Sequence, residues 1–168
     1  MERIQPEVWN LLSRGFKYLV ISSAISIFWW WFTPLLGLGS VIAVFAISKY
    51  LRVALKELSK IDKRFKTCYN GIIILFLGYV IAAGIYTYMY SIFLLPVGIL
   101  LGLTLTAFRL YKICRDWRFL AASIIYVPEA VASIFLILGV FSVVGHVLAY
   151  SALKSITKKL QATTSENF

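Results

Sequence analysis

Four long apolar stretches constrain the fold of this 168-residue chain more than any other feature. Hydrophobic residues make up 61% of the chain, charged residues only 14%, and the mean hydropathy is +0.85. A soluble domain is usually about a quarter charged, because water has to solvate its surface. Lipid, in contrast, accepts an apolar exterior if the backbone satisfies its own hydrogen bonds. The sequence therefore predicts an all-α, polytopic transmembrane helical bundle.

Interruptions within these stretches divide them into six candidate spans. The longest stretch, 119–153, contains no Lys or Arg. As a single helix it would be about 50 Å long, which exceeds a hydrocarbon core of roughly 30 Å. Its strongest breaker is Pro128-Glu129, so we expect the last two spans to meet there. A short re-entrant fifth limb, which would leave five full spans, stays open as an alternative. The predicted spans are 18–32, 35–48, 71–89, 91–108, 113–127 and 130–153.

The 17 Lys and Arg residues fall into four segments, 1–17, 49–70, 109–118 and 154–159. The turns between these segments contain none, and the positive-inside rule then predicts three helical hairpins with an N-in/C-in topology. We expect a multi-pass protein of the cell membrane with both termini cytoplasmic. Residues 1–17 are expected to form an amphipathic interfacial segment, 18–153 the transmembrane domain, and 154–168 a polar cytoplasmic tail.

The net charge of +10 would indicate a nucleic-acid partner in a soluble protein. In a membrane protein the same excess sets orientation and attracts anionic lipid headgroups. We therefore expect the partners to be the lipid bilayer and its anionic headgroups, and not nucleic acid.

The second predicted span continues into a segment that is apolar on one side and cationic on the other. We expect one helix to run from the membrane into the headgroup layer, with Asp62 and Lys66 spaced for a pair along it. The alternative interpretation is a solvated helix end that only sets orientation. The candidate lipid-headgroup or partner contacts are Arg52, Lys56, Lys60, Lys63 and Arg64.

Gly98 and Gly102 form a GxxxG spacing in the fourth predicted span. Without Cβ atoms, two helices approach closely and gain van der Waals contact. We expect these glycines to be helix-packing residues, either within the chain or between chains. A homo-oligomer or other membrane subunits would be the partners in the second case.

Two ionisable residues stand out in the last apolar stretch. His146, the only histidine, is a candidate intramembrane polar contact. A proton relay or a haem ligand would need a companion that the sequence does not offer at its depth, so we expect a neutral imidazole bonded to a neighbouring helix. Glu129 follows Pro128 at the predicted start of the last helix, where its charge would complement the helix N-terminus.

Three stretches resemble small multi-pass membrane proteins of archaea, particularly crenarchaea, whose function is not known. They are Pro34-Leu35-Leu36-Gly37-Leu38-Gly39, the basic exit from Tyr50 through Leu58, and Tyr69-Asn70-Gly71. The resemblance covers most of the chain in style, and it implies an origin more than an activity.

The absence of several sequence motifs argues against particular kinds of chemistry. No P-loop, dinucleotide glycine fingerprint, HExxH or nucleophile elbow occurs, and Cys68 and Cys114 do not form a CxxC pair. We therefore expect no enzyme, cofactor or metal. The spans also contain few of the ionisable residues that transporters and channels place along their pathways. The leading hypothesis is a non-catalytic structural or accessory subunit, and the alternative is a small channel or transporter built from repeated hairpins.

Overall fold

The computed structural model describes residues 4–28, 34–84, 88–134 and 140–165, whose secondary structure is entirely helical. Five helical segments in this part are long and apolar enough to cross a membrane, which confirms the predicted class of fold. In chain order the elements are α1 (Pro6–Ile27), α2 (Pro34–Ala46), η2 (Ile47–Leu51), α3 (Arg52–Ile61), α4 (Phe65–Ala83), α5 (Tyr88–Gly98), η3 (Ile99–Thr104), α6 (Leu105–Cys114), α7 (Trp117–Ile134) and α8 (Val140–Ser165). The segments η2 and η3 are π-helical, and each joins its two neighbours into one continuous rod.

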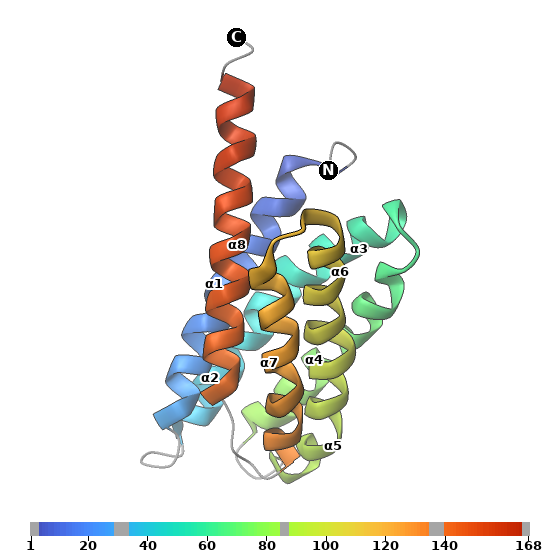
Figure 1. Ribbon diagram of the computed structural model, residues 1–168. Helices are drawn as coiled ribbons and strands as arrows, with labels where there is room; N and C mark the ends of the chain where they lie inside the picture. The colour runs from blue at the N-terminus through green and yellow to red at the C-terminus, as the bar shows by residue number, and fades with distance from the viewer. Residues whose placement is uncertain (1–3, 29–33, 85–87, 135–139, 166–168) are drawn as a thin grey trace.

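The resulting six rods alternate in direction and form three helical hairpins (Figure 1). Helix α1 packs against α2 and α8, α2 packs against α4, and α4 packs against α5 and η3. Helix α7 contacts α5, η3, α6 and α8. These contacts form a closed ring of rods, because α8 returns to α1. A continuous apolar core runs through it.

The first helix differs from the expected interfacial segment. Residues 6–17 belong to the same helix as the first span, and Trp9, Leu12 and Phe16 are fully buried in the core. The cause is an apolar stripe at helical spacing that continues from Val8 to Leu19 and so faces the bundle over its whole length. The last helix likewise extends beyond the expected span, and the predicted tail is helical as far as Ser165.

The predicted break at Pro128 is wrong. Helix α7 runs through this proline, and the connection to α8 falls within 135–139, outside the described residues. Pro96 lies inside α5 in the same way. A proline removes one hydrogen bond, but transmembrane helices tolerate this loss because neighbouring groups compensate for it. The fifth predicted span, 113–127, is accordingly replaced by a helix of 18 residues from Trp117 to Ile134.

The second span continues as a helix through α3, as predicted, and the π-helical turn η2 lies within this helix. The second rod of the next hairpin carries a π-helical turn at a similar place, where Thr104 Oγ1 donates to the Ile99 carbonyl over 3.3 Å. One extra residue per turn rotates the residues that follow, so each rod presents a new face to the core. Helix α3 ends at Ile61, earlier than the spacing of Asp62 and Lys66 requires, and Asp62 pairs with Arg64 instead.

The central hairpin is held by glycines at van der Waals contact. A Cβ atom on Gly71 would lie 2.3 Å from the Gly102 nitrogen, and one on Gly98 would lie 2.6 Å from the Leu75 backbone. Gly98 and Gly102 thus pack within the chain, against α4. The face that they provide is not available to a second copy of the protein.

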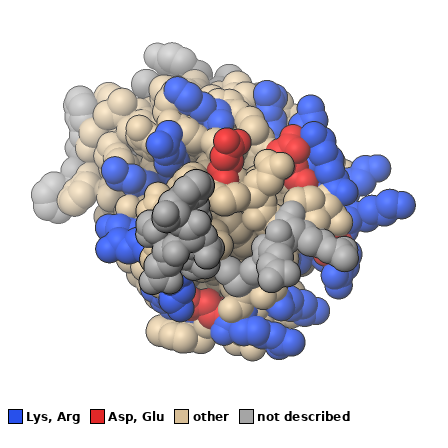
Figure 2. Space-filling model, turned by 90° about the horizontal axis from the view of Figure 1, so that it is seen from above, with Lys and Arg blue, Asp and Glu red and all other residues tan. Residues whose placement is uncertain are grey.

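Lys and Arg side chains collect at one end of the bundle, where α1 begins and α8 ends. Figure 2 looks down on this end and shows the cations around its rim. The chain carries no Lys or Arg between Lys17 and Lys49, between Lys66 and Arg109, or between Arg118 and Lys154. Because the rods alternate in direction, α1, α4 and α7 end, and α2, α5 and α8 begin, at the opposite end of the bundle.

Asp116 fixes the short turn between α6 and α7. Its Oδ1 accepts the backbone N–H of Arg118 at 3.0 Å, and its Oδ2 accepts from the Arg118 guanidinium at 2.6 Å. The Arg118 side chain holds the pKa of Asp116 below its ordinary value. The carboxylate therefore caps the start of α7 and also forms an ion pair.

We expect Asp116→Ala to lower the free energy of unfolding by about 1–2 kcal/mol, because a helix cap and an ion pair are lost together. The folded-state pKa is depressed, so this contribution is present above the ordinary Asp pKa of about 3.9 and is lost as the pH falls through the lower folded value. Unfolding titrations in detergent at neutral and acidic pH measure both effects. The matched control is Glu57→Ala, which removes an exposed pair with Lys60 and should cost less than about 0.5 kcal/mol. Equal losses in the two variants would contradict the capping role.

Candidate intramembrane polar site

A small polar cavity lies inside the ring, toward the end of the bundle that faces away from the cations. Five helices contribute to its lining, α1, α2, α4, α7 and α8. The cavity volume is about 10 Å³, which is close to the minimum for one water molecule. Most of the lining groups carry oxygen, and the lining consists of Ser22, Ser23, Ser26, Leu36, Ser40, Tyr79, Glu129 and Ser142.

Glu129 is the carboxylate of this cavity, and its side chain is almost completely buried, with the residue 1% exposed. It belongs to α7 and not, as predicted, to the start of the last helix. Its Oε2 nevertheless accepts the backbone N–H of Ser142 at 3.1 Å, in the first turn of α8. The predicted electrostatic role is therefore present, but it acts across two helices. A helix N-terminus stabilises a nearby negative charge.

Two of the lining serines, Ser22 and Ser23, donate their hydroxyl protons to backbone carbonyls. Ser22 Oγ donates to the Gly39 carbonyl at 2.7 Å, which ties α1 to α2, and Ser23 Oγ donates to the Leu19 carbonyl at 2.9 Å. A hydroxyl has one proton and two lone pairs, so these oxygens can only accept further hydrogen bonds. Together with the Glu129 carboxylate they make this part of the lining rich in acceptors.

His146 follows Ser142 by four residues on α8, so it lies about one helical turn further along this helix than the cavity lining. It is fully buried, and its Nδ1 lies 3.0 Å from Ser23 Oγ. Ser23 belongs to α1, so this contact joins the imidazole of α8 to a neighbouring helix.

Tyr126 lies beside His146, with the two ring centroids 5.3 Å apart. Among the described residues, neither Tyr126 Oη nor His146 Nε2 has a hydrogen-bond partner, although both atoms are buried. Tyr126 precedes Glu129 by three residues, so both side chains lie on one face of α7. Two buried polar atoms without a partner in the described part of the chain thus lie next to the cavity, where a bound water or ligand would satisfy them.

The five predicted headgroup contacts lie on α3 and on the turn that joins α3 to α4. Arg52, Lys56 and Lys63 are exposed to the surroundings, and Lys60 donates to Glu57 at 2.7 Å. Arg64 faces a pocket at the turn between α3 and α4. The predicted cationic stripe is exposed, and its contact with lipid headgroups stays a prediction.

Among the residues described, no group of three or more His, Cys, Asp or Glu side chains is placed to hold a metal ion. Comparison of the chain with protein families, with curated proteins and with solved structures gives no match. The fold and the site by themselves define the class, which is that of polytopic α-helical membrane proteins with a polar site inside the bundle.

Proposed function

We propose that the protein is a small membrane carrier that binds a cation, a proton or a monovalent ion near sodium in size, at Glu129. The observation that carries the proposal is a buried carboxylate in a cavity lined by hydroxyl oxygens. Ionisable groups inside a membrane are costly and usually mark ion pathways. A lining in which seven of the eight side chains carry oxygen suits hard cations, and a space of about one water excludes larger solutes.

This proposal reverses the order of the two functions expected from the sequence. A non-catalytic accessory subunit was favoured there because the sequence shows no recognisable site and few ionisable residues in the spans. The burial of Glu129 in a polar cavity removes that reason. A carrier needs no bond-making chemistry, so the protein is proposed not to be an enzyme.

The non-catalytic subunit remains the second candidate, supported by the small size of the cavity. Space for a single water leaves most of this interior close-packed, as in a structural protein. Pull-down from native membranes tests this candidate, because a subunit should co-purify with a defined partner or with itself. A solitary chain in mild detergent would argue for the carrier.

We propose that the cationic end, with both termini, faces the cytoplasm of the cell. The asymmetry of Lys and Arg between the two ends supports this orientation. A cytoplasmic reporter enzyme fused after the last residue should be active in cells, and an inactive reporter would reverse the orientation.

The carrier is tested by ion flux into proteoliposomes that contain the full chain. We expect a proton or sodium gradient to drive flux in the wild type, and Glu129→Gln to reduce it roughly ten-fold or more. The amide keeps an oxygen that accepts the Ser142 N–H, so the variant should fold. Glu57→Gln removes an exposed carboxylate instead and should leave flux unchanged. Absence of flux of either ion in the wild type, or full flux in Glu129→Gln, would overturn the proposal.

A further inference from the structure

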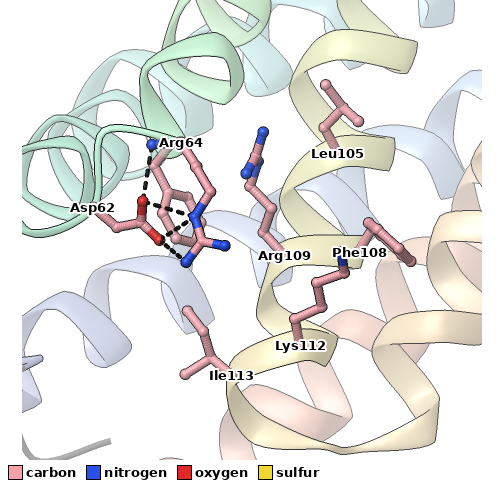
Figure 3. A pocket seen from close by; sticks show the side chains of 8 residues that line it. Asp62, Arg64, Leu105, Phe108, Arg109, Lys112 and Ile113 are labelled. Atoms are coloured by element: carbon pink, nitrogen blue, oxygen red, sulfur yellow. Dashed lines mark hydrogen bonds and ion pairs between the residues drawn. The ribbon is translucent and has the colours of Figure 1, made fainter.

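A second pocket lies at the cationic end, between the turn that joins α3 to α4 and the side of α6. Its volume is about 190 Å³, more than ten times the roughly 10–15 Å³ that one water needs. Figure 3 shows it from close by, with Arg64 on one side and Arg109 and Lys112 on the other. The lining residues are Asp62, Arg64, Phe65, Leu105, Phe108, Arg109, Lys112 and Ile113.

The charges around this pocket leave a positive excess. Asp62 is occupied by Arg64, which donates to it through both its backbone N–H at 2.9 Å and its guanidinium at 3.0 Å. Arg64 holds the pKa of Asp62 below its ordinary value, so the carboxylate stays ionised and paired. Among the lining residues no other carboxylate faces Arg109 and Lys112.

Arg109 offers a donor that the described part of the chain does not use. Its Nε is buried and has no hydrogen-bond partner there. A buried guanidinium nitrogen without an acceptor is costly, which indicates that an acceptor from outside the chain belongs beside it. Lys112 is one turn away, and its Nζ lies 4.6 Å from the Phe108 ring centroid. The two cations of α6 therefore flank one opening.

The same pocket has an apolar wall. Leu105, Phe108 and Ile113 come from α6 and lie on its pocket side, and Phe108 is 38% exposed. Helix α6 continues a rod long and apolar enough to cross a membrane, and the pocket lies near the end of that rod. The end of a membrane-spanning rod is expected at the level where lipid headgroups meet their acyl chains.

We propose that this pocket binds the phosphate of an anionic membrane lipid, with Arg109 and Lys112 contacting the phosphate oxygens and Phe108 contacting the acyl chain. Arg64, held by Asp62, forms the opposite wall. Guanidinium groups match phosphate geometry, and the apolar wall distinguishes a lipid from a soluble anion. This site is separate from the cavity at Glu129 and does not depend on ion transport.

The test measures lipid binding by the full chain in mild detergent, by native mass spectrometry with phosphatidylglycerol and with phosphatidylcholine. We expect phosphatidylglycerol to bind preferentially, and Arg109→Gln combined with Lys112→Gln to weaken its binding about five-fold or more. The matched control is Arg52→Gln combined with Lys56→Gln, which removes the same charge from exposed positions on α3. This control should change binding less than about two-fold.

Three results would overturn the proposal. The first is an equal loss in the two double variants, which would show only general attraction to the cationic end. The second is equal binding of both lipids by the wild type. The third is displacement of phosphatidylglycerol by inorganic phosphate, which would make the pocket a soluble-anion site. Unfolding of both variants in the absence of lipid is measured alongside, and Lys112→Gln alone, at an exposed position, provides a weaker perturbation if the double variant does not fold.

Discussion

Gly98→Ala should destabilise the bundle by about 2 kcal/mol, although alanine is the better helix former. The new Cβ would lie 2.6 Å from the Leu75 backbone, so α4 and α5 would have to separate. Overpacking of this kind costs about 3 kcal/mol at the upper end, and the higher helix propensity of alanine offsets up to about 1 kcal/mol. Unfolding titrations in detergent would measure the difference.

Gly37→Ala is the matched control for this substitution. Within the described part of the chain, its Cβ would contact only the Ala83 carbonyl oxygen, at an ordinary 3.5 Å. This variant should therefore keep the propensity gain and be as stable as the wild type or slightly more so. Equal stability of the two alanine variants would show that the close approach of α4 and α5 does not hold the central hairpin together.

The helical class, the number of rods and the cationic end follow from local properties of the sequence. Apolar stretches of span length and a complete separation of Lys and Arg are readable along the chain. The break assigned to Pro128 was wrong because a proline in a span has two outcomes, a turn or a tolerated helix interior. Which one occurs depends on neighbouring helices, and these are not visible in one sequence.

The polar cavity could not be predicted for the same reason, because it depends on how neighbouring helices pack. Placing Glu129 at the start of the last helix, next to the predicted turn, put it outside the bundle. A signal did exist, because Ser22, Ser23 and Ser26 fall on one helical face. Tyr126 and Glu129 share another face, and Ser142 and His146 share a third. Unpaired polar groups are costly in lipid, so three helices that each carry a polar stripe are expected to pack with these stripes facing one another.

Direct labelling of Glu129 would show whether it binds a cation within the membrane. A hydrophobic carbodiimide dissolves in the bilayer and adds covalently to a protonated carboxyl group, whereas exposed carboxylates react with it less because they remain ionised in water. A carboxyl that exchanges protons or sodium should react with this reagent while it carries a proton, and bound sodium should protect it. A carboxylate that serves only as a cap for α8 should stay bonded to the Ser142 N–H and should not respond to cations.

The most direct measurement is therefore mass-spectrometric mapping of the carbodiimide adduct on the full chain in liposomes, with and without sodium at constant ionic strength and at several pH values. The account predicts an adduct at Glu129 that sodium or a higher pH suppresses roughly five-fold or more, and its absence in Glu129→Gln. No adduct at Glu129 under any of these conditions, or an adduct that neither sodium nor pH changes, would contradict a cation-binding site in the bundle.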